Sequence, residues 1–187
     1  GLKQIQWIAD HAGLEILDVE LNSVNGGSLS VTAGLKGKTQ FSVNANVQKM
    51  LLAEQEAGLS TLVPYQQFAA RVAQARAELM AFVSRVEHEG KKILGIGAST
   101  KGNVLLQYCG FTSDQIGKIG DVNVDKHGSV TPGSWIPIQA EDEILASNPD
   151  YLLVLPWHFR DFFINNPKFK GRTLVFPLPK LDIVKCT

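Results

Sequence analysis

The sequence predicts an α/β fold: a Rossmann-like parallel sheet with helices on both faces, preceded by a helix–β-hairpin segment and a long connecting helix. From residue 91 onward, apolar runs of strand length alternate with helical segments, which is typical of a parallel, right-handed α/β sheet. Several of these runs, such as YLLVL, are apolar at almost every position. Such runs indicate strands that are buried on both faces of the sheet.

Composition limits the classes of function. The chain has 187 residues, of which 44% are hydrophobic, enough for one sizeable core. Lysine plus arginine number 18, as do aspartate plus glutamate, and the basic residues are scattered, so we expect neither nucleic-acid nor membrane binding. No apolar run approaches membrane-spanning length. Cys109 and Cys186 are the only cysteines, which favours free thiols in a reducing cytoplasm over a disulfide framework.

The first block of the chain, residues 1–44, predicts a helix followed by an antiparallel hairpin. Residues 2–12 place apolar side chains on one helical face and end at Gly13, a suitable C-cap. Residues 14–34 alternate apolar and polar on either side of an Asn-Gly-Gly turn. About 35 residues of regular structure cannot form an independent core. We therefore expect this block to complete a sheet outside the chain, and the abrupt start within a helix likewise indicates a fragment.

The second block, residues 45–90, is helical. A short helix after Asn46 ends near Gly58, and a longer one runs from Pro64 to Gly90 over roughly 25 residues, or about 35 Å. Its apolar residues recur at steps of three and four and form one stripe: Phe68, Val72, Ala75, Leu79, Phe82, Val83 and Val86. Such a helix packs across a sheet or connects two domains.

The third block, residues 91–187, predicts the sheet itself. We expect its strands near 93–97, 118–123, 151–155 and 173–176, with the first of them central and the hairpin at 14–34 packed apart from them. The intervening runs GNVLLQYCG, AEDEILASN and DFFINNPKF predict helices. Ligands of such open sheets bind at the carboxyl ends of the strands. Those ends are the segments 97–103, 123–134, 156–160 and 177–180.

The glycine-rich turn after the first strand of this block resembles two nucleotide-binding signatures and matches neither. Thr100 replaces the third glycine of the dinucleotide fingerprint, and Lys101 precedes the second glycine of a Walker A spacing instead of following it. Backbone N–H groups, a helix N-terminus and Lys101 nevertheless make a plausible anion site. The other candidate contacts are Gly97, Ser99, Gly102 and Asn103. The alternative is that Ser99 or Thr100 only caps the helix and that Lys101 is solvated.

Further polar residues follow the other strands. Trp157 and His158 come directly after the third strand and are candidates for substrate binding, although a surface imidazole is the simpler reading of His158. Asp121 and Asp125 follow the second strand, where a dinucleotide fold carries its ribose-binding acid, but acids are also common in turns. We expect no metal site, because the remaining histidines have no companions at ligand spacing.

Four segments carry a family resemblance: GASTKGNVLLQYCG, TPGSWIPI, PDYLLVLPWHF and VFPLP. They resemble the C-terminal domain of S-adenosylmethionine-dependent sugar C-methyltransferases, which act on nucleotide-linked deoxysugars. The resemblance implies that residues 1–44 are the end of the methyltransferase core, 45–90 a connector and 91–187 the Rossmann-like C-terminal domain. It also implies that S-adenosylmethionine is bound by the core and zinc by an N-terminal domain, both upstream of residue 1. No catalytic residue then lies in this chain.

The function implied by this resemblance is to bind the nucleotide-diphosphate sugar substrate of a C-methyltransferase. We expect the chain alone to have no methyltransferase activity and no affinity for S-adenosylmethionine. One alternative is a nicotinamide- or coenzyme A-binding domain of an oxidoreductase or ligase, which the missing third glycine disfavours. A second alternative is a non-catalytic scaffold module that dimerises through its long helix.

Overall fold

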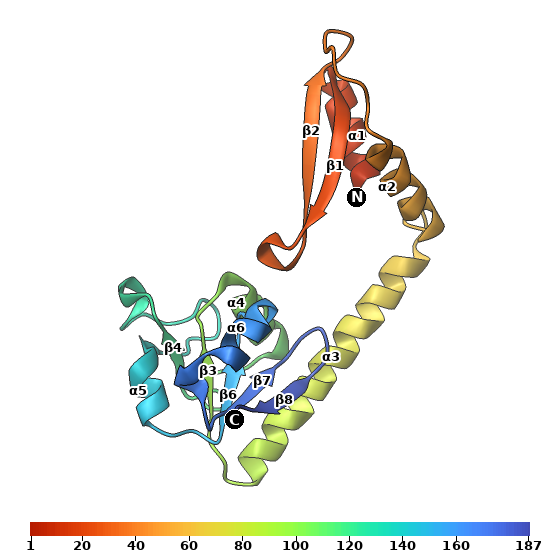
Figure 1. Ribbon diagram of the computed structural model, residues 1–187. Coiled ribbons are helices and arrows are strands. Elements are labelled where there is room, and N and C mark those ends of the chain that lie inside the picture. Colours follow the sequence, from red (N-terminus) through yellow and green to blue (C-terminus); the bar gives the residue numbers. More distant parts are fainter. The chain divides into compact units, whose positions relative to one another are not determined.

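The computed structural model describes residues 1–187 as two compact units, Gly1–Ala70 and Arg71–Thr187, which we call the N-terminal and the C-terminal unit (Figure 1). The boundary between them falls inside the long helix α3 (Val63–His88). It therefore lies within the segment expected to connect the two folded parts.

The N-terminal unit is a β-hairpin with two helices. Helix α1 (Leu2–His11) precedes strands β1 (Leu14–Asn22) and β2 (Ser28–Leu35), which pair antiparallel, and α2 (Ala45–Glu56) follows. A 3-10 turn, η1 (Val24–Gly26), joins the strands with three successive residues at positive φ, as the Asn-Gly-Gly sequence predicts. The small core of this unit comprises Leu2, Ala9, Ile16, Val19 and Val47.

The C-terminal unit contains a six-stranded sheet in the order β5-β4-β3-β6-β7-β8. Its strands are β3 (Ile93–Ile96), β4 (Ile119–Asp121), β5 (Ile138–Ala140), β6 (Tyr151–Val154), β7 (Thr173–Phe176) and β8 (Asp182–Lys185). All pairs are parallel except β7 with β8. The four expected strands and the inner position of the first are confirmed, as is the separation of the hairpin from this sheet. The two edge strands, β5 and β8, were not expected.

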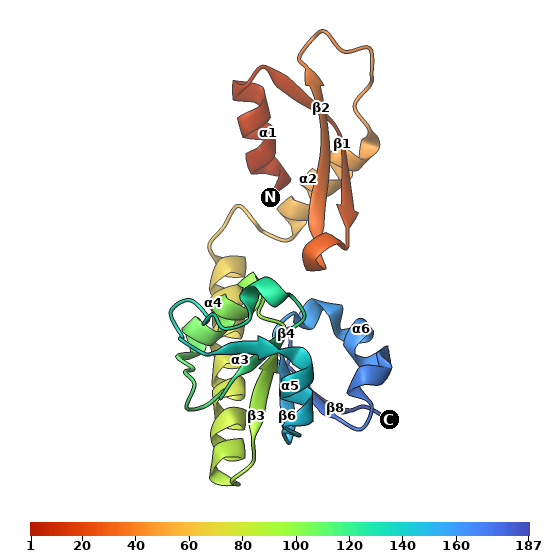
Figure 2. The ribbon, with the colours of Figure 1, turned by 90° about the vertical axis from the view of Figure 1, so that its left-hand side faces the viewer.

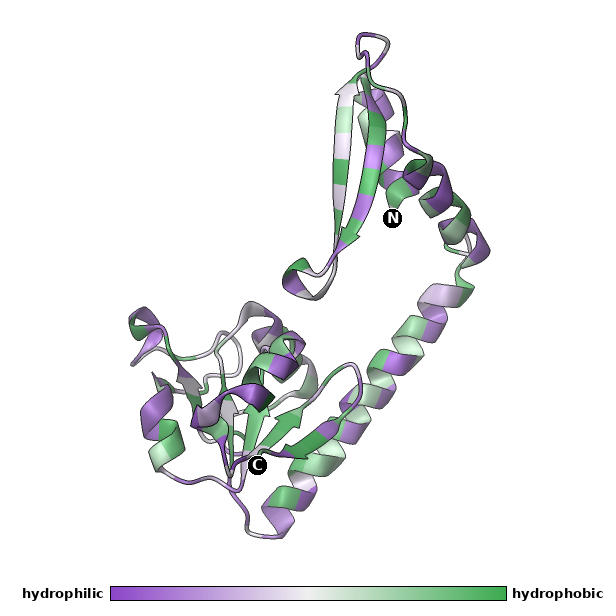
Figure 3. Cartoon of the chain, viewed as in Figure 1, coloured by the Kyte–Doolittle hydropathy of each residue, from purple (hydrophilic) through white to green (hydrophobic).

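Helices cover both faces of this sheet, which confirms the Rossmann-like α/β fold class. Residues of α3 and α4 (Thr100–Cys109) share one buried cluster with one face, whereas α5 (Glu141–Ala146) and α6 (Arg160–Asn165) share a second cluster with the other. Figure 2 shows the two pairs of helices on opposite sides of the strands. Hydrophobic residues run along β6 and β7 in Figure 3 because both faces of these strands are covered.

Two helices differ from expectation. The apolar stripe of α3 is buried only toward its C-terminal end, at Leu79, Phe82, Val83 and Val86, whereas Phe68 is 60% exposed. Helix α6 stops at Asn165 instead of continuing through the next four residues. Asn166 is extended at φ −83° and ψ 118°, as steric contact with Pro167 favours, and a separate 3-10 turn, η4 (Pro167–Phe169), follows.

Cys109 and Cys186 are both free and buried, as the sequence predicts for thiols without a bridging partner. Burial raises the pKa of each thiol, so both are held in the neutral, unreactive form. None of the helices combines the length and the apolar character needed to cross a bilayer.

Candidate functional site

A cleft of about 500 Å³ opens at the carboxyl edge of the parallel sheet. Strands β3 and β6 are neighbours, but the chain leaves β3 toward β4 and leaves β6 toward β7, which makes this edge the switch point of the sheet. The cleft lies on the side of α5 and α6. Its lining comprises Gly97, Ala98, Ser99, Asp121, Val122, Asn123, Lys126, Glu141, Pro156, Phe159, Phe162, Phe163, Asn166, Lys168 and Phe169.

The carboxylate of Asp121, at the end of β4, holds together the segments at the bottom of this cleft through hydrogen bonds. Its side chain is only 7% exposed, and its Oδ2 accepts hydrogen bonds from the Ala98 N–H at 2.7 Å and from Lys126 Nζ at 2.9 Å. Its Oδ1 accepts from the Asn123 N–H at 2.8 Å, and Lys126 Nζ also donates to the Ala98 carbonyl at 3.0 Å. The carboxylate therefore joins the turn after β3 to β4, which leaves little capacity for the ribose contact considered from the sequence.

The glycine turn is built by close packing against the chain after β6. Gly97 has φ +77°, and a Cβ there would lie 2.7 Å from the Pro156 ring. A Cβ on Gly102 would lie 2.5 Å from the Leu155 Cβ. Ser99 caps α4, because its Oγ accepts from the Gly102 N–H at 3.0 Å. Gly102 thus allows the close helix–strand approach that the third glycine of the dinucleotide fingerprint provides, two positions later than in that motif.

The predicted site residues of this turn divide between two pockets. Gly97 and Ser99 line the cleft on the α6 side, whereas Thr100 and Asn103 line a second pocket of about 560 Å³ that Ser99 also borders. The Asn103 Oδ1 is buried and has no hydrogen-bond partner in this chain. Lys101 is exposed in the first turn of α4. Ser99 therefore caps the helix as the simpler alternative holds, and Lys101 lines neither pocket.

The two candidates after β6 have different surroundings. Trp157, in the 3-10 turn η3 (Trp157–Phe159), is partly buried and packs against both hydrophobic clusters. The His158 ring lies 4.2 Å from the Phe159 ring between centroids, tilted by 41°, and its Nδ1 is buried without a hydrogen-bond partner. Burial and, secondarily, the charge of Lys101 hold the pKa of His158 below its ordinary value.

This lowered pKa predicts a pH effect. The unfolded chain binds a proton at His158 at higher pH than the folded chain does. The stability contributed by neutral His158 is therefore present above its ordinary pKa of about 6.5 and is lost as the pH falls through the lower folded value. NMR titration should place the His158 pKa below that of a histidine-containing peptide, and Lys101→Ala should move it upward. A pKa at or above the peptide value would contradict this assignment.

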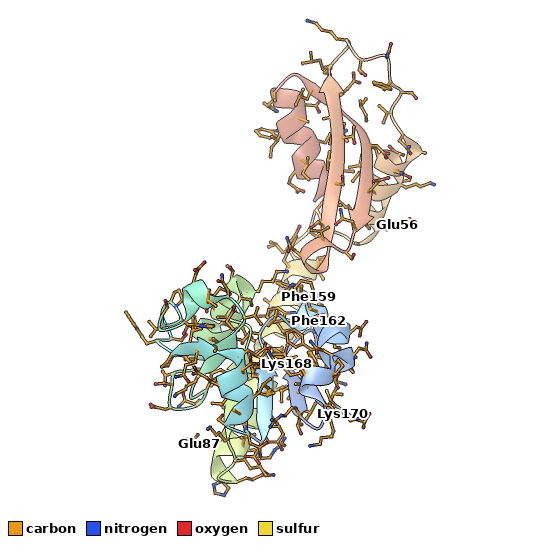
Figure 4. The ribbon with its side chains drawn as sticks, turned by 60° about the vertical axis from the view of Figure 1, so that its left-hand side comes forward. Glu56, Glu87, Phe159, Phe162, Lys168 and Lys170 are labelled. Atoms are coloured by element: carbon orange, nitrogen blue, oxygen red, sulfur yellow. The ribbon has the colours of Figure 1, made fainter.

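The largest group of cleft residues that sequence reasoning missed is aromatic and comes from η3, α6 and η4. Phe159 and Phe162 are exposed, whereas Phe163 and Phe169 are buried behind them. Figure 4 labels the two exposed rings together with Lys168, which also lines the cleft. The only signal in the sequence was the aromatic-rich run HFRDFF directly after a strand end, where ligands of such sheets bind.

Comparison with known proteins identifies relatives over most of the chain. Residues 23–179 match the family described as the C-methyltransferase C-terminal domain. The chain is also similar to the C-methyltransferase NovU of Streptomyces niveus, with 34% identity over 175 residues. That match covers 92% of this chain but 41% of NovU, so the chain spans less than half the length of this relative.

Proposed function

Because this chain belongs to the family of C-methyltransferase C-terminal domains, we propose that it is the substrate-binding part of an S-adenosylmethionine-dependent C-methyltransferase. The substrate in this proposal is a sugar carried on a nucleoside diphosphate. Its diphosphate lies at the N-terminus of α4, beside Ser99, Thr100, Lys101, Gly102 and Asn103. Methyl transfer itself is assigned to a methyltransferase core outside these residues, and no residue of this chain is assigned as the catalytic base.

The observation that carries the proposal is the start of α4 at the switch-point edge of the sheet, with an exposed lysine in its first turn. The first N–H groups of a helix have no acceptors within the helix, and although the Ser99 Oγ already accepts from the Gly102 N–H here, the helix dipole favours an anion at this end. Lys101 adds a full positive charge to these partial charges. Asn103 lines the adjoining pocket of about 560 Å³, which is where the sugar would lie.

Neither cofactor of the proposed enzyme fits this chain. Lys101 disfavours the cationic sulfonium of S-adenosylmethionine, since like charges repel at the turn where a nucleotide would otherwise bind. No three histidine, cysteine, aspartate or glutamate side chains gather where they could hold a metal ion. We therefore assign S-adenosylmethionine and zinc to other parts of the enzyme. The chain alone is expected to have neither methyltransferase activity nor affinity for S-adenosylmethionine.

The proposal predicts the effect of Lys101→Ala in the enzyme that joins this chain to its methyltransferase core. The KM for the nucleotide sugar should rise roughly ten- to a hundredfold, since losing a charge-assisted hydrogen bond costs about 1.5–3 kcal/mol. The KM for S-adenosylmethionine should stay nearly constant. Lys118→Ala, at the opposite end of β4, is the matched control and should change neither constant. If Lys101→Ala has the wild-type KM for both substrates, the turn serves only to cap α4 and the proposal is wrong.

A further inference from the structure

We propose that the cleft between α5 and α6 binds the nucleoside end of the substrate, with Phe159 and Phe162 forming the surface on which the base stacks. The inference rests on the function proposed above and adds a second subsite to it. The diphosphate occupies the N-terminus of α4, and the uncharged base and its pentose occupy the cleft.

The first step is the aromatic wall. Phe159 and Phe162 are 54% and 62% exposed although they lie in a concave site. Each ring has an aromatic neighbour: Phe162 packs edge-on against Phe163 at 5.4 Å between centroids, and Phe159 lies 4.2 Å from the His158 ring. Phe163 in turn contacts Phe169, with 5.3 Å between centroids. Two exposed rings that already have aromatic neighbours offer a planar ligand large contact area with little side-chain ordering. A nucleobase is such a ligand.

The second step is the charge of the floor. The cleft contains two lysines, and both are already paired with carboxylates. Lys126 pairs with Asp121 at 2.9 Å, and Lys168 Nζ lies 2.6 Å from Glu141 and 2.7 Å from Asp142. A phosphate placed here would meet a carboxylate beside each cation, which cancels most of the attraction. The cleft therefore favours an uncharged group.

The third step is the supply of hydrogen-bond donors. Asn123 and Asn166 line the cleft, and each uses its Oδ1 to accept a backbone N–H two residues further on. This use of Oδ1 identifies the remaining NH2 group of each amide as the donor available to a ligand. Ring nitrogens, ring carbonyls and pentose hydroxyls are acceptors that such donors recognise. The polar groups of the cleft therefore complement a nucleoside better than a hydrocarbon.

The fourth step is continuity between the subsites. Ser99 lines the cleft and also caps α4, so the wall of the cleft ends where the proposed diphosphate site begins. A nucleoside stacked on the phenylalanines can therefore extend its 5′-phosphates past Ser99 toward Lys101. The sugar to be methylated then projects beyond the turn.

The experiment measures binding to this chain by calorimetry, with thymidine, uridine, adenosine and guanosine 5′-diphosphates and inorganic pyrophosphate as probes. The wild-type chain should bind at least one of the nucleoside diphosphates. Phe159→Ala and Phe162→Ala should each weaken that binding about tenfold or more, the usual effect of removing a ring that stacks on a base. Neither change should alter the affinity for pyrophosphate, whereas Lys101→Ala should weaken both. Phe41→Ala removes a ring of similar exposure, 68%, from the N-terminal unit and should change nothing.

The outcomes separate this inference from the proposed function. If Lys101→Ala weakens nucleotide binding and neither phenylalanine variant does, the cleft inference is overturned and the proposed function stands. If the phenylalanine variants weaken pyrophosphate binding as much as nucleotide binding, the cleft holds the anion and the assignment of subsites is wrong. A wild-type chain that binds none of the nucleoside diphosphates overturns both. Unchanged thermal unfolding of the variants, which is expected at exposed positions, excludes a folding defect.

Discussion

Asp121→Ala should lower the free energy of unfolding of the C-terminal unit by about 3 kcal/mol, the largest effect expected for any polar residue of the chain. The substitution leaves the Ala98 and Asn123 N–H groups without their acceptor and the Lys126 ammonium with the Ala98 carbonyl but no carboxylate. Removing one member of a buried ion pair typically costs about 3–5 kcal/mol. The Lys126 side chain is 38% exposed, so water compensates part of the loss and the lower end of that range applies.

Denaturant unfolding followed by circular dichroism measures this effect. Asp125→Ala is the matched control, because this neighbouring aspartate is exposed and should change stability by less than about 0.5 kcal/mol. Equal midpoints for the two variants would mean that Asp121 is not the residue that fastens the turn after β3. In that case its carboxylate would again be a candidate for ligand contact.

Gly102→Ala should lower the free energy of unfolding of the C-terminal unit by about 1–3 kcal/mol, although helix propensity alone predicts that it should raise it. In an exposed helix the same change stabilises by roughly 0.5–1 kcal/mol. Here the new methyl group would lie 2.5 Å from the Leu155 Cβ, so α4 would have to move away from the chain that follows β6. Because α4 presents the proposed diphosphate site, the variant should also lose nucleotide affinity.

The measurement is again denaturant unfolding. Val104→Ala, at an exposed position of the same helix, serves as the control and should stay within about 0.5 kcal/mol of wild type. A stabilised Gly102→Ala variant would show that α4 can be displaced without cost and that the close contact is not required.

The parts of the fold that could be predicted from the sequence are those with a long or repeated pattern. The strands β3, β6 and β7 are continuous apolar runs, and the C-terminal half of α3 shows helical periodicity. The strands β5 and β8 were missed because they follow proline-containing segments that are typical of loops, not because of their length, which is the same as that of the predicted strands. These segments are strands because they pair with β4 and β7, and the local sequence does not predict that pairing.

The residues of the candidate site also divide into those that a local sequence pattern predicts and those that depend on contacts distant in sequence. The turn at residues 97–103 was singled out because glycines that follow an apolar strand and a lysine at the start of a helix are typical of anion sites. The role of Gly102 was not found, since it depends on the approach of Leu155, which is distant in sequence. The aromatic wall was missed for a related reason. Whether Phe159 and Phe162 are buried or exposed is decided by where η3 and α6 turn, and the helical pattern alone places all the phenylalanines in the core.

The order of strands in the sheet has a consequence for how the chain folds during synthesis. β3 is the first strand of the C-terminal unit to be made, yet it lies between β4 and β6. Lys92 at its start bonds to Asp150, 58 positions further along. At about 5–20 residues per second, the nascent chain carries one unpaired edge of an apolar strand for on the order of 3–12 s. During that interval α3, already made, can cover the face of β3 with which it shares a buried cluster in the folded unit, while the edge that later pairs with β6 stays open.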